Sequence, residues 1–268
     1  MLTTTKKREK SKGFTLVELL IIAPIVVILV SGFVALMITM VGDVLLTRSQ
    51  TNATYESQDA LDRIERDTRL SNSFLTTTGT LPSPQGSDGG FTGTAAFTNT
   101  SNTIILSELP TDANPASTTR WLIYYANQPN ACGSQQETAN VPFTVRIVYF
   151  INNGSLWRRT IVPDFNHNTT VDSQTICSTT HDPWQVNSCS PGYSATRCKT
   201  QDEELVKNIT SLGVKYYSSP SGTTDLGPTG AAAATTIETT INTSSSAAGR
   251  TYTSSVSLRA TRLNTTSN

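Results

Sequence analysis

A single carboxylate, Glu18, lies at the start of a long apolar run. Five basic residues occur between positions 6 and 12, and residues 19–41 then carry no charge over 23 positions. A helix of that length rises about 34 Å, enough to cross a hydrocarbon core of about 30 Å. Because a charge in such a segment is costly when it has no partner, Glu18 predicts an electrostatic pairing.

Three simpler interpretations of the run compete with a functional role for Glu18. A secretory signal peptide has a shorter apolar run and a small-residue cleavage site after it, whereas Gly13 precedes this one. A buried soluble helix rarely has so long an uncharged stretch. A plain signal anchor explains the length and, since the basic residues come first, an N-terminus inside and the rest outside. It does not explain Glu18 or the Gly13–Phe14 junction.

Residues 13–21, Gly-Phe-Thr-Leu-Val-Glu-Leu-Leu-Ile, resemble the class III signal of type IV pilins and type II secretion pseudopilins. The resemblance implies that a prepilin peptidase cleaves between Gly13 and Phe14 and that Phe14 becomes N-methylated. It also implies that Glu18 pairs with the N-terminal amine of a neighbouring subunit. Prepilin peptidase, other minor and major pilins, and the cytoplasmic membrane are the partners expected from it.

Other residues of the run bear on helix packing. Ser31, Gly32 and Ala35 offer small surfaces at which neighbouring helices can approach closely. Pro24 removes one backbone hydrogen bond and predicts a kink or a melted stretch.

The four cysteines predict disulfides, because all of them follow the span on the outward side. Three lie between positions 163 and 203, which makes Cys189–Cys198 with Cys132–Cys177 the first choice among three pairings. A zinc site is the alternative, although its spacing lacks a Cys-x-x-Cys pair. Its ligands would be Cys177, His181, Cys189 and Cys198.

No cofactor is expected, although one loop is a candidate for calcium binding. Oxygen-bearing side chains occupy positions of an EF-hand-like register at Asp164, Asn166, Asn168 and Asp172. The register is incomplete, since Thr169 and Thr175 stand where Gly and Glu are expected. A polar loop with local Asn and Asp turns is the commoner explanation of such a pattern.

Composition and motifs argue against an enzyme or a nucleic-acid-binding protein. The chain has 20 basic and 20 acidic residues, and removal of residues 1–13 leaves 15 against 19, a balance of −4. A basic nucleic-acid surface is therefore not expected. No hydrolase, metalloprotease or phosphate-loop motif occurs, so no catalytic residue is expected.

The elements beyond the span predict an α+β subunit, in which the long helix packs on an antiparallel sheet. Acid-first pairs four residues apart support a helix at Asp59–Arg63, Asp62–Arg66 and Glu65–Arg69. This charged run is expected to be a solvated face opposite a packing stripe of Leu61, Ile64 and Thr68. Strands are expected at 103–106, 120–125, 143–151, 155–162, 211–217 and 251–263, with an Asn153-Gly154 hairpin turn.

These elements define a leader (1–13), an N-terminal helix (14–75, of which 14–42 is transmembrane) and an extracytoplasmic β-rich head (76–268). The order of the helix, the 148–159 hairpin and the 206–217 strand resembles the larger minor pilins of the PilW/PulJ (J-type) group. That resemblance implies a structural subunit that helps initiate assembly of a type IV pilus or a type II secretion pseudopilus. Glu18 argues against the extreme-tip position, since the subunit proposed for it typically lacks this residue.

Two functions of other classes remain open at this point. The first is an adhesin or DNA-uptake module displayed on the filament, which would require a basic groove in the head. The second is a signal-anchored surface enzyme, which would require a convergent pocket. The expected location is the cytoplasmic membrane with the N-terminus inside, and then a surface or periplasmic filament.

Overall fold

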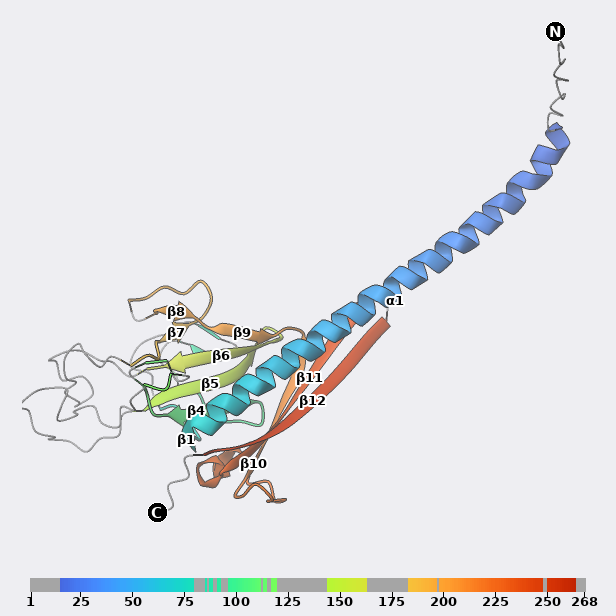
Figure 1. Cartoon of the computed structure of the whole chain (residues 1–268). Helices are drawn as coiled ribbons and strands as arrows, with labels where there is room; N and C mark the ends of the chain where they lie inside the picture. Colours follow the sequence, from blue (N-terminus) through green and yellow to red (C-terminus); the bar gives the residue numbers. More distant parts are fainter. Residues whose placement is uncertain are drawn as a thin grey trace, which may run out of the picture. The chain divides into compact units, whose positions relative to one another are not determined.

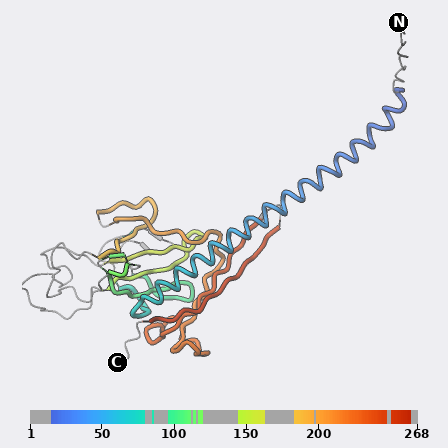
Figure 2. Tube along the Cα trace, in the orientation of Figure 1, coloured from blue at the N-terminus to red at the C-terminus, as the bar shows by residue number. Residues whose placement is uncertain are grey.

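The protein has an α+β fold in which a long N-terminal helix is followed by antiparallel sheets (Figures 1 and 2). The computed structural model describes residues 15–79, 85, 87–88, 91–92, 96–111, 113–114, 117–119, 144–162, 183–196, 198–247 and 250–263. The chain divides into two units. The described part of the first is 15–48 with 246–247 and Arg250, and the second, the head, holds the remaining residues.

Helix α1 spans Leu16–Leu70 and contributes to both units. Its buried positions in the head follow a helical period of three and four residues, at 57, 60, 61, 64, 67 and 68. The predicted stripe of Leu61, Ile64 and Thr68 is confirmed, since all three side chains are buried. The helix ends five residues before the expected boundary at residue 75, because strand β1 (Ser71–Phe74) follows it directly.

The larger sheet of the head has five antiparallel strands in the order β1-β4-β5-β6-β9 (Figure 1). The further strands are β4 (Thr103–Glu108), β5 (Val145–Asn152), β6 (Ser155–Ile161) and β9 (Glu203–Val206). Asn153 and Gly154 join β5 to β6 with φ of 50° and 74°. Positive φ at both central residues is the requirement of a type I′ turn, so the predicted Asn-Gly hairpin is confirmed.

A second sheet has three strands in the order β10-β11-β12. Its strands are β10 (Ile209–Tyr217), β11 (Thr236–Ala247) and β12 (Arg250–Thr261), with a short 3-10 helix, η1 (Pro228–Ala233), between the first two. Two small pairs complete the described strands. They are β2 (Ser87–Asp88) with β3 (Phe91–Thr92), and β7 (Ser188–Cys189) with β8 (Thr200–Gln201).

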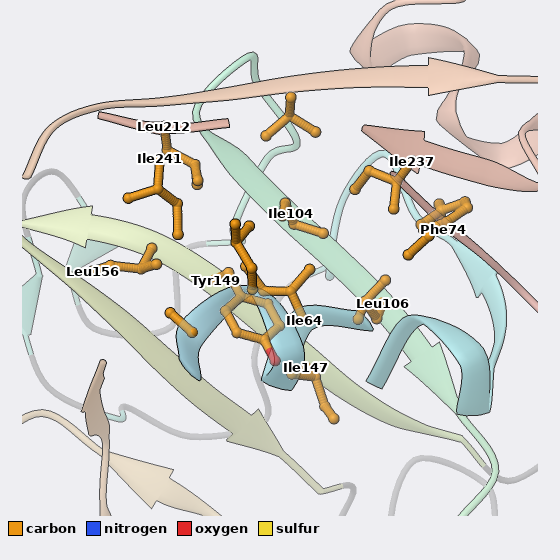
Figure 3. Packing of buried hydrophobic residues seen from close by; sticks show 14 of the residues in the cluster. Ile64, Phe74, Ile104, Leu106, Ile147, Tyr149, Leu156, Leu212, Ile237 and Ile241 are labelled. Carbon is orange, nitrogen blue, oxygen red and sulfur yellow. The ribbon is translucent and has the colours of Figure 1, made fainter. Parts of the chain in front are cut away.

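The main core of the head lies between α1 and the two sheets (Figure 3). The helix contributes Ala60, Leu61 and Ile64. The five-stranded sheet contributes Ile104, Leu106, Ile147, Tyr149 and Leu156, and the three-stranded sheet Leu212, Val214, Tyr216, Ile237, Ile241 and Ala260. Side chains of alternate strand residues enter this core, as the period of two requires.

A smaller core occupies the opposite face of the five-stranded sheet. It consists of Phe97, Ile105, Val148, Phe150 and Ile161, with Leu75 and Trp157 packed against it. Both faces of β4 and β5 are therefore buried, which explains why β4 is apolar at three successive positions, Ile104 to Leu106.

The strands predicted near 103–106, 143–151, 155–162, 211–217 and 251–263 are all present. The strand predicted at 120–125 lies outside the described residues. The sequence does not predict strand β11, because its Thr- and Ser-rich composition resembles that of a loop. Its two isoleucines, Ile237 and Ile241, are both fully buried, and β-branched threonines favour an extended chain.

Candidate functional site: the exposed helix and the buried ion pairs

The first turn of α1 is capped by its own side chains. The Thr15 backbone N–H and hydroxyl both donate to Glu18 Oε2 at 2.9 Å, and the Glu18 N–H donates to Thr15 Oγ1 at 3.3 Å. This reciprocal arrangement is a capping box, which satisfies donors that the helix start leaves without partners. Within one chain Glu18 therefore holds the helix end, and its carboxylate remains exposed to the surroundings.

The apolar part of α1 is fully exposed. Large side chains from Leu16 to Val41 lie on the surface on all sides of the helix, and none of them enters a core. Among the described residues, α1 is the one helix long and apolar enough to cross a membrane. Its hydroxyls are satisfied internally: Ser31 donates to the Val27 carbonyl at 2.7 Å and Thr39 to the Ala35 carbonyl at 2.9 Å. Such internal pairing is what a hydrocarbon surrounding requires.

The small residues and the proline of the span also have clear positions. A Cβ built on Gly32 would meet no atom within 4 Å, so this surface is open to a neighbouring helix. The helix continues through Pro24, and the residues around it are helical. The expected alternative of a melted stretch at Pro24 is therefore wrong.

Several predicted site residues lie outside the described residues. They are the cleavage-site residues Gly13 and Phe14, the cysteines Cys132 and Cys177, His181, and the calcium candidates Asp164, Asn166, Asn168 and Asp172. Within the described ranges, no group of three or more His, Cys, Asp or Glu side chains is arranged to hold a metal ion.

A buried ion pair joins α1 to the five-stranded sheet. Arg158 Nε and the Tyr149 hydroxyl each donate to Asp67 Oδ2 at 2.7 Å. Arg63 Nε lies 3.9 Å from Asp67 Oδ1, and its Nη2 lies 3.5 Å from Glu203 Oε2. The prediction that the charged run is a solvated face is therefore wrong for Asp67. The spacing of Asp67 from Ile64 and Ala60 indicates that Asp67 is buried, because it puts all three residues on one face of the helix.

The acid-first helical pairs have a mixed outcome. Arg69 Nη2 lies 2.5 Å from Glu65 Oε1, which confirms one of them. Arg63 instead approaches Asp67, four residues further along, and Glu203 on β9. The sheet has therefore redirected this arginine away from the predicted partner, Asp59.

A second carboxyl group, Glu108, lies beside this ion pair at the end of β4. Its side chain is buried, and its Oε1 has no hydrogen-bond partner among the described residues. Burial, reinforced by the negative charge of Asp67, raises the pKa of Glu108 well above its usual range. Burial and Asp67 also raise the pKa of the Tyr149 hydroxyl, which keeps this donor protonated. The helix–sheet junction thus holds two carboxyl groups, and burial beside Asp67 favours the protonated form of Glu108.

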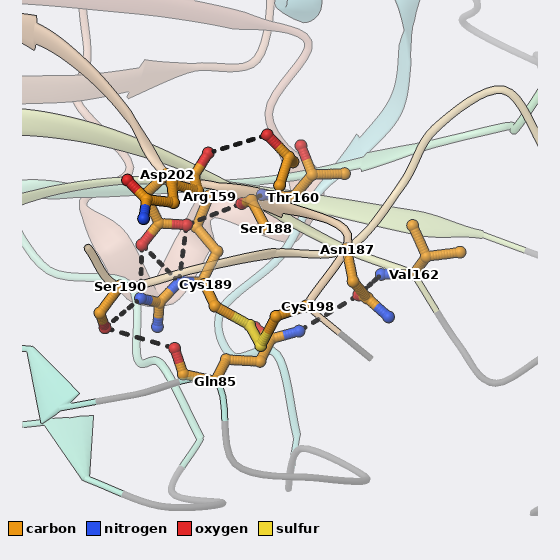
Figure 4. Close-up of a disulfide and its surroundings, with 12 residues drawn as sticks. Gln85, Arg159, Thr160, Val162, Asn187, Ser188, Cys189, Ser190, Cys198 and Asp202 are labelled. Atoms are coloured by element: carbon orange, nitrogen blue, oxygen red, sulfur yellow. Dashed lines mark hydrogen bonds and ion pairs between the residues drawn. A yellow bond between two sulfur atoms is a disulfide. The ribbon is translucent and has the colours of Figure 1, made fainter. Parts of the chain in front are cut away.

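The neighbouring arginine, Arg159, lies on the opposite face of the sheet, beside Phe97 and Phe150 of the smaller core. Figure 4 shows its polar partners. Its Nε lies 3.2 and 3.0 Å from the two carboxylate oxygens of Asp202, and its Nη2 lies 2.5 Å from Oδ2. The Arg159 Cζ is 5.3 Å from the centre of the Phe150 ring and 5.5 Å from that of Phe97, within cation–π range. Only 1% of each charged side chain is exposed.

Serine hydroxyls extend this ion pair into the segment that covers the sheet. Arg159 Nη2 donates to Ser190 Oγ at 2.9 Å, and the Ser188 hydroxyl donates to Asp202 at 2.7 Å. The Thr160 N–H donates to Ser188 Oγ at 2.8 Å. Ser188, Ser190 and Asp202 are therefore fixed to β6 by a continuous polar network, as Figure 4 shows.

The disulfide Cys189–Cys198 closes a turn within the same segment, with a Cα–Cα distance of 5.5 Å (Figure 4). This half of the predicted pairing is confirmed. The zinc alternative is wrong, because two of its three proposed thiolates, Cys189 and Cys198, are joined to each other. The role of this bridge is structural, as it restrains the segment that carries Ser188, Ser190 and Asp202.

Replacement of both Cys189 and Cys198 by serine is expected to lower the free energy of unfolding by about 2.5–3 kcal/mol. The physical reason is the loop entropy that the bridge, with a sequence separation of 9, removes from the unfolded chain. Urea unfolding of the full chain in detergent micelles, followed by tryptophan fluorescence, measures this difference. A change below about 0.5 kcal/mol, the usual size for a neutral surface substitution, would contradict the proposed role.

Compared with protein-family models the chain matches none, and no curated protein is significantly similar to it. The family resemblance therefore rests on the sequence motifs alone.

Proposed function

We propose that this protein is a minor pilin or pseudopilin, a structural subunit that helps initiate assembly of a type IV pilus or a type II secretion pseudopilus. The observation that carries the proposal is the fully exposed apolar helix with one carboxylate, Glu18, in its first turn. A surface of this kind is stable only in a bilayer or among other apolar helices. The order of the motif, span and β-rich head agrees with such a subunit.

In this proposal the span first inserts in the cytoplasmic membrane with the N-terminus inside. Prepilin peptidase then removes residues 1–13, and Phe14 becomes the methylated N-terminus. Neighbouring minor and major pilins take over the apolar contacts of the helix when the subunit leaves the membrane. Glu18 pairs with the terminal amine of a neighbour, and because both charges are poorly solvated the pair fixes the register between subunits.

The head supports a structural role in this proposal. Two of its ion pairs, Asp67–Arg158 and Arg159–Asp202, hold the helix and the covering segment to the sheet. Asp67, Arg159 and Asp202 are buried and the Arg158 side chain is 14% exposed, which supports a structural role for both pairs.

Glu18→Gln tests the assembly role and separates it from helix capping. Glutamine can still accept the hydrogen bonds of the capping box, but it carries no charge. Loss of the Glu18 charge leaves the N-terminal amine of the neighbouring subunit unpaired among apolar helices. An unpaired charge in such surroundings costs more than about 1.4 kcal/mol, so incorporation into filaments is expected to fall at least about tenfold. Immunoblots of sheared filaments and of membranes measure incorporation, total level and leader removal.

Glu18→Ala and Asp62→Asn are the matched variants. Alanine removes both the cap and the charge, whereas Asp62 is an exposed carboxylate further along the same helix. We expect the Gln and Ala variants to fail equally and the Asn variant to assemble normally. Normal assembly of Glu18→Gln together with failure of Glu18→Ala would show that capping, not charge pairing, is the role of Glu18. Normal assembly of both would contradict the proposal.

A further inference from the structure

The hairpin tip, meaning here the described residues 246, 247 and 250 at the ends of β11 and β12, lies against α1 just beyond the apolar span. Arg250 Nη1 lies 2.8 Å from Asp43 Oδ1, and both residues belong to the first unit of the chain. The Ser246 hydroxyl donates to the Arg250 carbonyl oxygen at 3.3 Å. Ser246 and Arg250, more than 200 positions after Asp43 in the sequence, are thereby held at the level of Asp43 along the helix.

The depth of Asp43 in a bilayer follows from the span. Residues 19–41 have no charge, and Asp43 is the first charged residue after them. Two residues of helix rise about 3 Å, whereas each headgroup layer is about 5–7 Å thick. When the uncharged run fills the hydrocarbon core, Asp43 therefore lies within the headgroup layer, and the hairpin tip bonded to it lies there too.

The chemistry of Arg250 suits that layer. Its side chain is 64% exposed, and within the described part of the chain Nη1 makes the only hydrogen bond of its guanidinium group. Four N–H donors thus remain for other acceptors. Phosphate oxygens are the acceptors that fill the headgroup layer, and the planar guanidinium group matches them with paired hydrogen bonds.

We propose that residues Asp43, Ser246 and Arg250 form a membrane-surface contact in which Arg250 binds the phosphate of a phospholipid headgroup. The contact fixes the hairpin tip at the bilayer surface while the subunit is membrane-inserted, and it has to be released before the subunit enters a filament. This inference rests on the membrane-inserted stage of the proposed function, and it assigns to the hairpin a role that the assembly motif does not predict.

Photo-crosslinking of the full chain tests the contact. Benzoylphenylalanine is placed at Ser246 or, separately, at Leu36 in the span, and the protein is reconstituted in vesicles of phosphatidylethanolamine and phosphatidylglycerol. Both side chains are exposed in the structure. Mass spectrometry after irradiation identifies lipid and protein adducts. Lipid adducts are expected at both positions.

Charge variants then test the role of Arg250. Arg250→Glu is expected to reduce the lipid adducts at position 246 several-fold, whereas Arg250→Lys retains most of them. Lys207→Glu makes the same charge change at a lysine of similar exposure, 65%, and is expected to leave the adducts unchanged.

Each other outcome is decisive. Lipid adducts at position 36 but none at 246 would overturn the surface contact and leave the membrane span intact. Lipid adducts at neither position would overturn the span itself, and with it this contact. Adducts from 246 to a second copy of the chain would assign the tip to a subunit interface. Lipid adducts unaffected by Arg250→Glu would overturn the phosphate contact.

Discussion

Arg159→Ala is expected to lower the free energy of unfolding of the head by about 3–5 kcal/mol, among the largest effects of any single substitution in this chain. The substitution leaves the Asp202 carboxylate buried without its cation and removes the guanidinium group that lies over the Phe97 and Phe150 rings. Urea unfolding of the full chain in detergent micelles, followed by tryptophan fluorescence at pH 7, measures the loss.

Two further variants distinguish the buried pair from general damage. Arg159→Met with Asp202→Leu replaces both charges by apolar groups and is expected to cost less than Arg159→Ala alone, because no unpaired charge remains. Arg259→Ala removes an exposed arginine that stacks on Tyr217 at 4.0 Å, and its expected cost is about 1 kcal/mol or less. Equal losses for Arg159→Ala and Arg259→Ala would contradict the assignment.

Glu108→Gln is expected to remove a pH dependence of stability. Since burial raises the pKa of Glu108 in the folded protein, the folded state keeps a proton that the unfolded chain releases above its ordinary pKa of about 4.5. The stabilisation is complete below that pH and decreases as the pH rises toward the folded pKa, by about 1.4 kcal/mol per pH unit. Glutamine mimics the neutral form, so the variant should become the more stable protein as the pH rises.

Unfolding free energies of wild type and variant between pH 5 and about 8 provide the measurement. The difference between them should grow with pH across the titration window. Asp62→Asn, at an exposed position of α1, is the control and should leave the pH dependence unchanged. A difference between wild type and Glu108→Gln that is constant with pH would contradict a neutral Glu108 at the helix–sheet junction.

The sequence predicts those parts of the fold that local rules determine. Asn153-Gly154 has the φ values of its turn type, and Leu61, Ile64 and Thr68 are buried because a helical period decides which face packs. The membrane-spanning length of α1 is likewise a property of consecutive residues. Cys189 and Cys198 could be paired from their proximity in one loop segment.

The burial of Asp67 and Arg159 cannot be predicted from the sequence. Their spacing puts them on buried faces, but charged residue types favour exposed positions. Asp67 follows Ala60 and Ile64 on the buried face of α1, but a carboxylate there requires Arg158, 91 positions away, to be present on the sheet. Arg159 lies on the same face of β6 as Trp157 and Ile161, but it is buried only because a further segment covers that face. That segment, residues 188–202, has loop-like composition, and its placement depends on the same ion pair.

The adjacent residues Arg158 and Arg159 have a consequence for how the head opens. Because successive strand residues point to opposite faces, one arginine holds α1 through Asp67 and the other holds the 188–202 segment through Asp202. Helix α1 and the 188–202 segment both contact β6, but each is held by its own carboxylate. Either one can therefore detach while the other remains in place. We therefore expect two separate local unfolding reactions in the head, with amide exchange of the covering segment independent of that of the helix.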